Sequence, residues 1–477
     1  MNAPTQLLRS EDHVMKRTTL SLVTAFSALL AFTSPALAQS SAATPESTTA
    51  TASTDAAKAT TPPADVNWLK GRPVTIQYVR QLDRRGINIF ETSKEPGVEY
   101  TGFKLDWGAA FTSQVQSLNH SNTSQAMMTN NVNTNQLADI GFGFNTSTAN
   151  LYLNSQLAKG IRVELAMYLS SRHHNETWVK GGYVQMDESP IDIKPLNKLM
   201  EFVTVRVGHM EINYGDAHFR RTDNGNAVYN AFVGNYMMDA FTTEIGAEVY
   251  AKTHGVIAMA AVTGGEIRGT VLTPGQRGPS YIGKLGVDRQ VRPNLRVRLT
   301  GSMYRTEKAL SNTLYGGDRA GSRYYYVLEN TASAEATQFT SGNINPGFRN
   351  SVTAFQVNPF VKFGGLEVFG VIERAEGKAL AEATNRQFNQ QAVDVVYRFA
   401  GDALQVGGRY NRVNGQLAGM TNDVEGERWQ FGGGWFVTTG LLVKAVYVNQ
   451  KFTGYPVTHI RNGGQFKGMM LEGVVAF

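Results

Sequence analysis

The feature that most constrains the fold of this 477-residue chain is an alternation of apolar and polar residues with a period of two, repeated along most of its length. In the stretch IRVELAMYLSS (161–171), for example, every second residue is apolar, and Arg162, Glu164 and Tyr168 occupy positions between them. Successive side chains of a β-strand point to opposite faces, whereas an amphipathic helix repeats every ~3.6 residues. The pattern therefore predicts strands whose two faces meet different surroundings.

The C-terminal sequence MMLEGVVAF shows the same alternation and ends on an aromatic residue. Phe477, Val475 and Leu471 fall on one face of this stretch, and Glu472 falls on the other. An apolar row opposite a charged residue suggests a strand with water on one side. On its own this pattern fits two structures equally, a wall in a membrane or the last strand of a soluble sheet.

The N-terminal region indicates export. Two basic residues follow Met15 and precede a short apolar stretch that closes on the small-residue sequence ALA. This order is typical of a secretory signal peptide, which we expect to cover residues 1–38, to start at Met15 and to be cut after Ala38. A membrane anchor is the alternative, but the apolar stretch is short and is interrupted by Ser and Thr.

Composition narrows the class of exported protein. No other segment holds the ~18 consecutive apolar residues that a spanning helix needs. Cys is absent, which excludes a disulfide framework and thiol chemistry. The chain contains 48 Gly, and 10% of its residues are aromatic. These features leave two classes, a periplasmic or secreted β-protein and an outer-membrane barrel.

Three segments follow the signal region. Residues 39–65 are almost wholly Ala, Ser, Thr and Pro, and they lack the apolar side chains that offset the entropy of ordering, so they predict a disordered linker. Residues 66–96 are expected to form a periplasmic lead-in segment, either a strand or a plug packed below the main fold. Residues 97–477 carry the alternating pattern and are predicted to form the barrel.

The connections between the predicted strands are sorted by length. Tight turns are predicted at 158–160, 253–255, 291–294, 364–365, 401–402 and 439–440. Longer polar segments lie between them at 118–135, 213–240, 264–280, 307–350 and 415–425, and the exceptions are a short connection at 172–176 and a long one at 188–200. A transmembrane barrel has tight periplasmic turns and larger external loops, whereas a soluble sandwich has no reason to sort its loops.

The pattern predicts sixteen strands. They are expected near 103–117, 137–157, 161–171, 177–187, 201–212, 241–252, 256–263, 281–290, 294–306, 351–363, 366–376, 387–400, 403–414, 426–438, 441–453 and 464–477. The predicted fold is therefore all-β, a transmembrane antiparallel up-and-down barrel. An even number of strands leaves both ends on the periplasmic side, and a barrel of this size encloses a lumen wide enough for a water channel.

These features together resemble those of Gram-negative outer-membrane porins. The stretch LNSQLAKGIRVELAMYLSS, followed by FVTVRVGHMEINYGD, is similar in layout to the phosphate-selective (O and P type) porins. The resemblance covers roughly residues 97–477 and is one of pattern, because no anion-site motif of that group matches residue by residue. It implies an assembly signal at Phe477 and Val475, read by the barrel-assembly machinery, and by analogy a homotrimer.

The alternation also assigns the residues that face the lumen. The acidic residues of this row are Glu164, Glu244, Glu248, Asp394 and Glu472. The basic residues are Arg162, Arg206, Lys284, Arg296, Arg298, Lys362, Arg398, Arg409, Arg428 and Lys444. The excess of basic residues favours the passage of anions, because a cationic wall lowers the barrier for negative solutes. An ordinary lumen wall, in which mixed charges are hydrated and pair with one another, explains the same residues.

The segment 214–241 is the third long external connection, and the resemblance to porins implies that it folds inward as a pore constriction. It carries His218, Arg220, Arg221 and Asp223, and adjacent arginines can hold phosphate or carboxylate through forked hydrogen bonds. The alternative is a surface loop whose arginines bind lipopolysaccharide phosphates or nothing.

Other functions find little support in the sequence. His173 and His174 are adjacent and point in opposite directions on an extended chain, which makes a poor metal site. The G-x-S-x-G nucleophile motif is absent, and the basic residues are spread along the strands instead of clustered as nucleic-acid binding requires. We therefore expect no catalytic residues, no metal, no cofactor and no nucleic-acid partner.

Two functions remain open. The first is a porin, located in the cell outer membrane, that lets small hydrophilic solutes diffuse passively and favours anions such as phosphate. The second is a non-conducting barrel with a structural or adhesive role through its external loops, its lumen plugged by residues 66–96 or 307–350. Outer-membrane lipid and lipopolysaccharide are expected partners of either.

Overall fold

The computed structural model describes residues 76–92, 99–145, 147–170, 177–268, 271–317, 325–333 and 341–477. The chain divides into two compact units, residues 1–65 and 66–477, and all the described residues belong to the second. The signal peptide predicted at 1–38 and the linker predicted at 39–65 lie outside the described residues and stay predictions.

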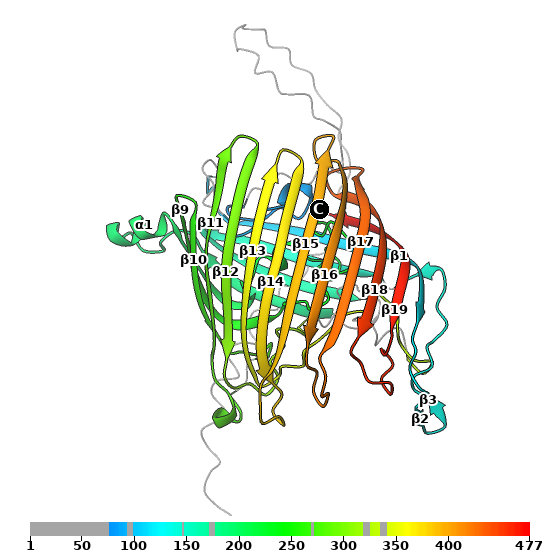
Figure 1. Cartoon of the computed structure of the whole chain (residues 1–477). Helices are drawn as coiled ribbons and strands as arrows, with labels where there is room; N and C mark the ends of the chain where they lie inside the picture. Colours follow the sequence, from blue (N-terminus) through cyan, green and yellow to red (C-terminus); the bar gives the residue numbers. More distant parts are fainter. Residues whose placement is uncertain are drawn as a thin grey trace, which may run out of the picture. The chain divides into compact units, whose positions relative to one another are not determined.

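Sixteen antiparallel strands form one closed ring, which confirms the predicted fold class (Figure 1). The strands are β1 (Lys104–Ser121), β5 (Thr148–Ala158), β6 (Ile161–Ser170), β7 (Thr177–Met186), β8 (Val203–Glu211), β9 (Thr243–Thr253), β10 (Val256–Thr263), β11 (Ser280–Arg292), β12 (Leu295–Thr306), β13 (Ser351–Phe363), β14 (Leu366–Lys378), β15 (Arg386–Phe399), β16 (Leu404–Gly415), β17 (Val424–Phe436), β18 (Leu441–Thr453) and β19 (Gln465–Ala476). Each pairs with its neighbours in the chain, and β1 closes the ring by pairing with both β5 and β19. Closure leaves no open sheet edge.

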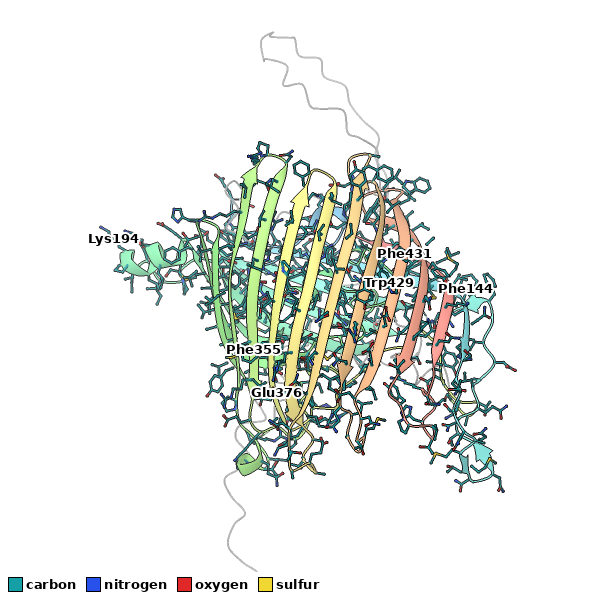
Figure 2. All side chains as sticks on the ribbon, in the orientation of Figure 1. Phe144, Lys194, Phe355, Glu376, Trp429 and Phe431 are labelled. Atoms are coloured by element: carbon teal, nitrogen blue, oxygen red, sulfur yellow. The ribbon has the colours of Figure 1, made fainter. Side chains whose placement is uncertain are left out.

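The two faces of the wall differ as the alternation predicts. On β19, Leu471 points outward with 45% of its surface exposed, while the neighbouring Glu472 points inward and is 1% exposed. Figure 2 shows Phe355, Trp429 and Phe431 on the outer surface of the barrel. In a closed barrel the backbone groups bond to each other, so only the side chains meet the two surroundings. Among the described residues, no helix has the length and apolar character needed to cross a bilayer.

The second wall strand begins later than the sequence predicts. A strand was expected over 137–157, but β5 starts at Thr148. The preceding residues contain only the two-residue strand β4 (Gly143–Phe144), which pairs with β1 at Val115 and Gln116. The chain leaves this register before Thr148, so the pairing with β1 is interrupted. The same connection carries the small hairpin of β2 (Met128–Thr129) and β3 (Val132–Asn133).

Short turns join the strands at one end of the barrel, which we call the short-turn end, and longer connections join them at the other. Of the two predicted exceptions, the long one at 188–200 is the connection between β7 and β8, which carries the helix α1 (Lys194–Met200). The short one at 172–176 lies outside the described residues and stays a prediction. Figures 1 and 2 show α1 and Lys194 standing out to the side of the barrel. The described residues also form the 3-10 helices η1 (Arg84–Gly86), η2 (Ala217–Arg220) and η3 (Pro274–Gln276).

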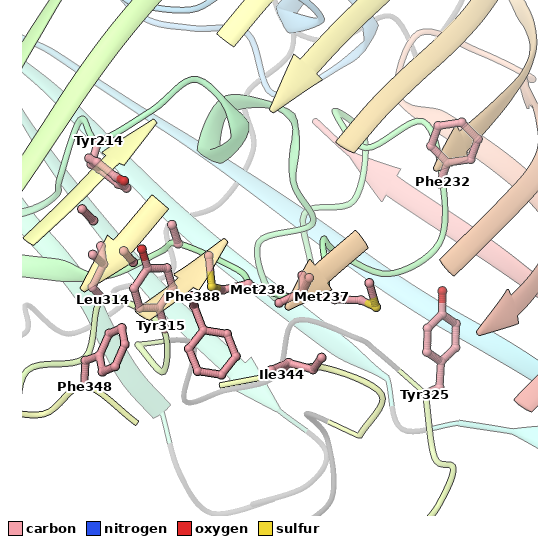
Figure 3. Close-up of a cluster of buried hydrophobic side chains, with 14 of the residues drawn as sticks. Tyr214, Phe232, Met237, Met238, Leu314, Tyr315, Tyr325, Ile344, Phe348 and Phe388 are labelled. Carbon is pink, nitrogen blue, oxygen red and sulfur yellow. The ribbon is translucent and has the colours of Figure 1, made fainter. Parts of the chain in front are cut away.

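Chain segments occupy much of the space inside the ring. A buried apolar cluster contains Tyr214 and Met237 from the β8–β9 connection, Leu314 from the β12–β13 connection, and Phe388 from the wall strand β15 (Figure 3). Several inward wall positions are therefore apolar, because they pack against these segments instead of facing water. The lumen predicted as a water channel is in this way partly filled by the chain itself.

Candidate functional site

The basic residues assigned to the lumen all lie on the inner face of the wall. Arg298, Arg398, Arg409, Arg428 and Lys444 are almost fully buried there. The side chains of Arg206, Arg296 and Lys362 keep part of their surface exposed, and Arg162 is buried. Alternation thus predicted the direction of each side chain, but it gave no information about what each one contacts.

Many of these basic residues hold the backbone of one loop. The connection between β8 and β9, residues 212–242, lies inside the barrel, and we call it the inner loop. Lys444 Nζ donates to the carbonyl oxygens of Ala227, Asn230 and Phe232 at 3.1, 2.9 and 3.1 Å. An irregular loop has carbonyl groups without partners in regular structure, and a buried carbonyl needs a donor. The wall lysine supplies it.

Two wall arginines bind the inner loop in the same way. Arg428 donates to the carbonyl oxygen of Asn235 at 2.6 Å, and Arg409 donates to that of Gly234 at 3.2 Å. Arg409 also forms a forked pair with Asp394 of β15, with both distances at 2.7 Å. The charges of this wall are therefore engaged by protein groups.

The structure places all four predicted constriction residues in the inner loop, within the barrel. His218 Nδ1 lies 2.6 Å from Glu211 Oε1, and burial lowers the pKa of His218 despite this carboxylate. Arg221 forms an ion pair with Asp239 at 2.6 Å. Asp223 accepts a bond from Lys180 of β7 at 2.6 Å.

Arg220 points to a different part of the interior from Arg221. Its guanidinium lies 3.5 Å from Glu367 of β14 and donates to the side chain of Asn88. The RR pair is thus split between two sites, so the structure does not bring the two guanidiniums together on one ligand.

Residues 76–92, which we call the inner segment, also lie inside the barrel, where the sequence predicted a lead-in segment or plug. Gln77 and Gln156 of β5 exchange bonds, with the Gln77 backbone N–H to Gln156 Oε1 at 2.8 Å and Gln156 Nε2 to Gln77 Oε1 at 2.9 Å. The backbone N–H of Arg84 donates to the carbonyl of Thr439, in the β17–β18 turn, at 3.0 Å. Both contacts place the segment at the short-turn end.

A buried cluster of four charges joins the inner segment, the inner loop and the wall. Arg298 of β12 donates to Glu91 at 2.9 Å and to Asp216 at 2.8 Å. Lys284 of β11 lies 3.2 Å from Glu91 and 3.1 Å from Asp216. Two carboxylates and two cations balance, which is the condition for burying charges. Burial alone opposes ionisation of Glu91 and Asp216, but Lys284 and Arg298 more than offset it and hold the pKa of both carboxyls below the ordinary range.

Aromatic packing fixes the inner segment against the inner loop. The ring of Phe90 lies edge-on to Phe219 of the inner loop at 5.7 Å and to Phe360 of β13 at 5.5 Å. The guanidinium of Arg80 lies 3.6 Å from the ring centre of Tyr229. Such contacts add specificity of position to the polar bonds.

A cavity of about 220 Å³ remains between the inner segment, the inner loop and the wall from β1 to β9. It is lined by polar, aromatic and aliphatic groups, among them His209, Tyr152, Tyr183 and Leu82. The basic residues along it are Arg80, Arg85, Arg162, Lys180, Arg206 and Arg221, and the acidic residues are Asp83, Asp106, Glu164, Glu211 and Asp223. In the part of the chain that the structure describes, no group of three or more His, Asp or Glu side chains is placed to hold a metal ion.

Sequence reasoning missed the residues that balance the wall charges. Glu91, Asp216 and Glu367 hold most of the buried cations near the short-turn end, and the first two lie outside the strands. A charge count would not have found them, because residues 66–96 carry six basic and three acidic residues, and the loop at 213–240 carries two basic and three acidic residues.

No protein-family model matches the sequence, and no curated protein matches it. Solved structures similar to the barrel include OmpT of Vibrio cholerae, an outer-membrane protein with 12% identity, 80% of this chain and 99% of that chain covered, and a TM-score of 0.46. OprB of Pseudomonas putida shows 12% identity, coverage of 79% and 94%, and a TM-score of 0.46. OmpF of Salmonella typhi, solved with daunomycin, shows 12% identity, coverage of 80% and 99%, and a TM-score of 0.46. The fold assigned here rests on the strand pairing of this chain.

Proposed function

We propose that this protein is an outer-membrane porin that lets small hydrophilic solutes diffuse across the membrane. The observation that carries the proposal is the closed ring of sixteen strands with an apolar outer row and a charged inner row. Only such a ring, or a bundle of helices, satisfies every backbone group inside a bilayer. The short-turn end then faces the periplasm, and the long connections face outward.

The passage follows the cavity beside β5–β9. At about 220 Å³ it has room for several water molecules or a small solute. Its lining carries six basic and five acidic residues. Because the excess is one positive charge, the proposed preference for anions, phosphate included, is weak and smaller than the wall charges alone suggest.

A non-conducting barrel is the second candidate, and the filling of the lumen favours it. The inner segment, the inner loop and part of the β12–β13 connection all lie inside the ring, and their polar groups are bonded to the wall. In this case the external connections would carry a structural or adhesive role.

Recordings in planar bilayers separate the two candidates. The porin predicts stepwise conductance and, under a salt gradient, a small reversal potential of anion-selective sign. Silent membranes, with the protein shown to be inserted and folded, would contradict the porin and leave the second candidate. Cation selectivity would contradict the proposed anion preference alone.

The proposed partners follow from the same placement. Phe477 pairs with Ala109 through two backbone bonds of 3.0 Å, and its ring lies 5.6 Å from Trp107 on the outer face. This accessible aromatic end and Val475 would be presented to the barrel-assembly machinery. Outer-membrane lipid and lipopolysaccharide would contact the apolar outer row, and a homotrimer is part of the proposal. Cross-linking in native membranes followed by mass determination tests the trimer.

A further inference from the structure

The inner segment is attached to the barrel in a way that differs from every wall strand. The structure describes a single backbone-to-backbone hydrogen bond between residues 76–92 and the wall or its turns, from Arg84 to Thr439. The remaining polar contacts involve side chains, such as Lys252 Nζ to the Glu91 carbonyl at 2.7 Å and Arg296 to the Asn88 carbonyl at 2.9 Å. The segment is therefore a ligand of the inner surface and no part of the sheet.

We propose that the short-turn end of the lumen is a binding site for residues 76–92 of the same chain, and that the segment leaves and re-enters this site. When it leaves, the passage widens. The inference rests on the proposed porin function only for its effect on conductance.

The wall cations that now bind the inner segment would keep ion-pair partners after the segment leaves, and this makes release possible. If Glu91 leaves, Arg298 still holds Asp216 through two bonds of 2.8 Å, and Lys284 still lies 3.1 Å from it. A buried cation left without a partner would cost several kcal/mol and would hold the segment in place. Asp216, together with Asp288 at 3.1 Å from Arg298, lowers that penalty because each cation keeps a carboxylate partner.

The same arrangement occurs at the second polar contact. Asn88 donates to Glu367 at 2.6 Å, but Glu367 also pairs with Arg398 at 3.0 Å and with Lys362 at 3.4 Å. Loss of Asn88 therefore leaves this carboxylate paired with two wall cations. Arg220 loses its bond to Asn88 but keeps Glu367 at 3.5 Å, so each buried charge of the two sites retains an oppositely charged neighbour.

The inner segment also forms one side of the remaining cavity. Val79, Arg80, Leu82, Phe90 and Thr92 all line it, opposite the wall strands. Its departure would join the cavity to the space that it now fills. The passage would then open at the short-turn end without any change in the wall.

Thiol labelling of the full-length protein tests release directly. The chain has no Cys, so Ile76→Cys introduces a single reactive group at a position that is 1% exposed. We expect slow labelling by a maleimide in this variant and at least tenfold faster labelling when Glu91→Gln is added. Glu188→Gln, at an ion pair of the short-turn end outside the segment, is the matched control and should leave the rate unchanged. Equal rates in all three proteins would overturn the inference.

A disulfide tether tests the effect on the passage. Because Arg84 and Thr439 share a backbone bond, Arg84→Cys with Thr439→Cys should place two sulfurs within bonding reach. We expect the oxidised protein to stay in its low-conductance state and the reduced protein to show larger openings. A pair in the wall, Ala445→Cys with Leu471→Cys, lies in register on β18 and β19 and should show no such difference.

The two readouts separate the two proposals. Accelerated labelling with no conductance in any variant would contradict the porin function and leave the binding site intact. Conductance that is identical in the oxidised and reduced tether would overturn the claim that release widens the passage.

Discussion

Glu91 and Arg298 lie 207 positions apart in the sequence, yet two hydrogen bonds of 2.9 and 3.1 Å join the Arg298 guanidinium to the two oxygens of the Glu91 carboxylate. Neither side chain has contact with solvent. This pair helps to fix the position of the inner segment, because Arg298 belongs to the wall strand β12. Lys252 and Lys284 also attract the Glu91 carboxylate in this position.

Replacing Arg298 with Gln should destabilise the folded barrel strongly. Glu91 and Asp216 would then share Lys284 as their only close cation in the described cluster, and breaking a buried ion pair in this way costs about 3–5 kcal/mol. The urea midpoint for unfolding from lipid vesicles measures the change. Arg305→Gln, which breaks an exposed pair with Glu307, should cost about 1 kcal/mol or less. Equal effects of the two substitutions would contradict this account of the cluster.

Acid should release the inner segment, and only at low pH. The folded-state pKa values of Glu91 and Asp216 are depressed, so their contribution to stability is complete above the unfolded value of about 4 and is lost as the pH falls through the lower folded values. The charged groups around Glu91 are Lys252, Lys284, Arg298, Asp216 and Glu248, which lie on the wall and on the inner loop.

Hydrogen exchange measures this pH dependence. Protection factors of residues 76–92, corrected for the intrinsic rate, should be equal at pH 7 and pH 5 and should fall only below about pH 4. Exchange of the β18–β19 pair provides the internal control. Loss of protection between pH 7 and pH 5 would show that another group controls release.

Replacing Lys444 with Met should loosen the inner loop. The substitution removes the donor to three carbonyl oxygens and the buried partner of Glu472, which lies on β19. We expect a loss of about 3–5 kcal/mol and larger current noise, because carbonyls left without donors leave the loop poorly held. Lys451→Met, at an outward and exposed position on the same strand, is the matched control. Unchanged current noise in Lys444→Met would show that Lys444 does not hold the inner loop in place.

Arg221 and Arg220 should differ in their effect on selectivity. Arg221 lines the cavity and neutralises Asp239, whereas Arg220 is not among the cavity-lining residues and pairs with Glu367. Arg221→Ala should therefore move the reversal potential toward cations, and Arg220→Ala should move it less. Both are read in planar bilayers under the same salt gradient. A larger shift from Arg220→Ala would place the passage on the other side of the inner loop.

The wall was predictable from the sequence because its environment repeats. Each wall strand presents apolar side chains on its outer face and mostly polar ones on its inner face, so the alternation can be read residue by residue. The strands β6, β14 and β18 begin where the pattern starts, at Ile161, Leu366 and Leu441. The direction of Arg162 or Arg428 follows from parity alone.

The interior was not predictable in the same way. The contacts of Asn88 with Glu367 and of Lys444 with the inner loop join residues hundreds of positions apart, and no periodic pattern marks them. The inner loop and inner segment are irregular, so their places depend on which wall donors happen to meet which carbonyls. Burial of the wall cations therefore became visible only in three dimensions.

The pairing of β1 with β19 sets an order of events for this molecule. Those strands come from opposite ends of the barrel sequence, so they can pair only once the strands between them are available. If the barrel closed first, the inner loop and the inner segment would have to enter through its open ends. We therefore expect the inner loop and the inner segment to take their places first and the pairing of β1 with β19 to form last.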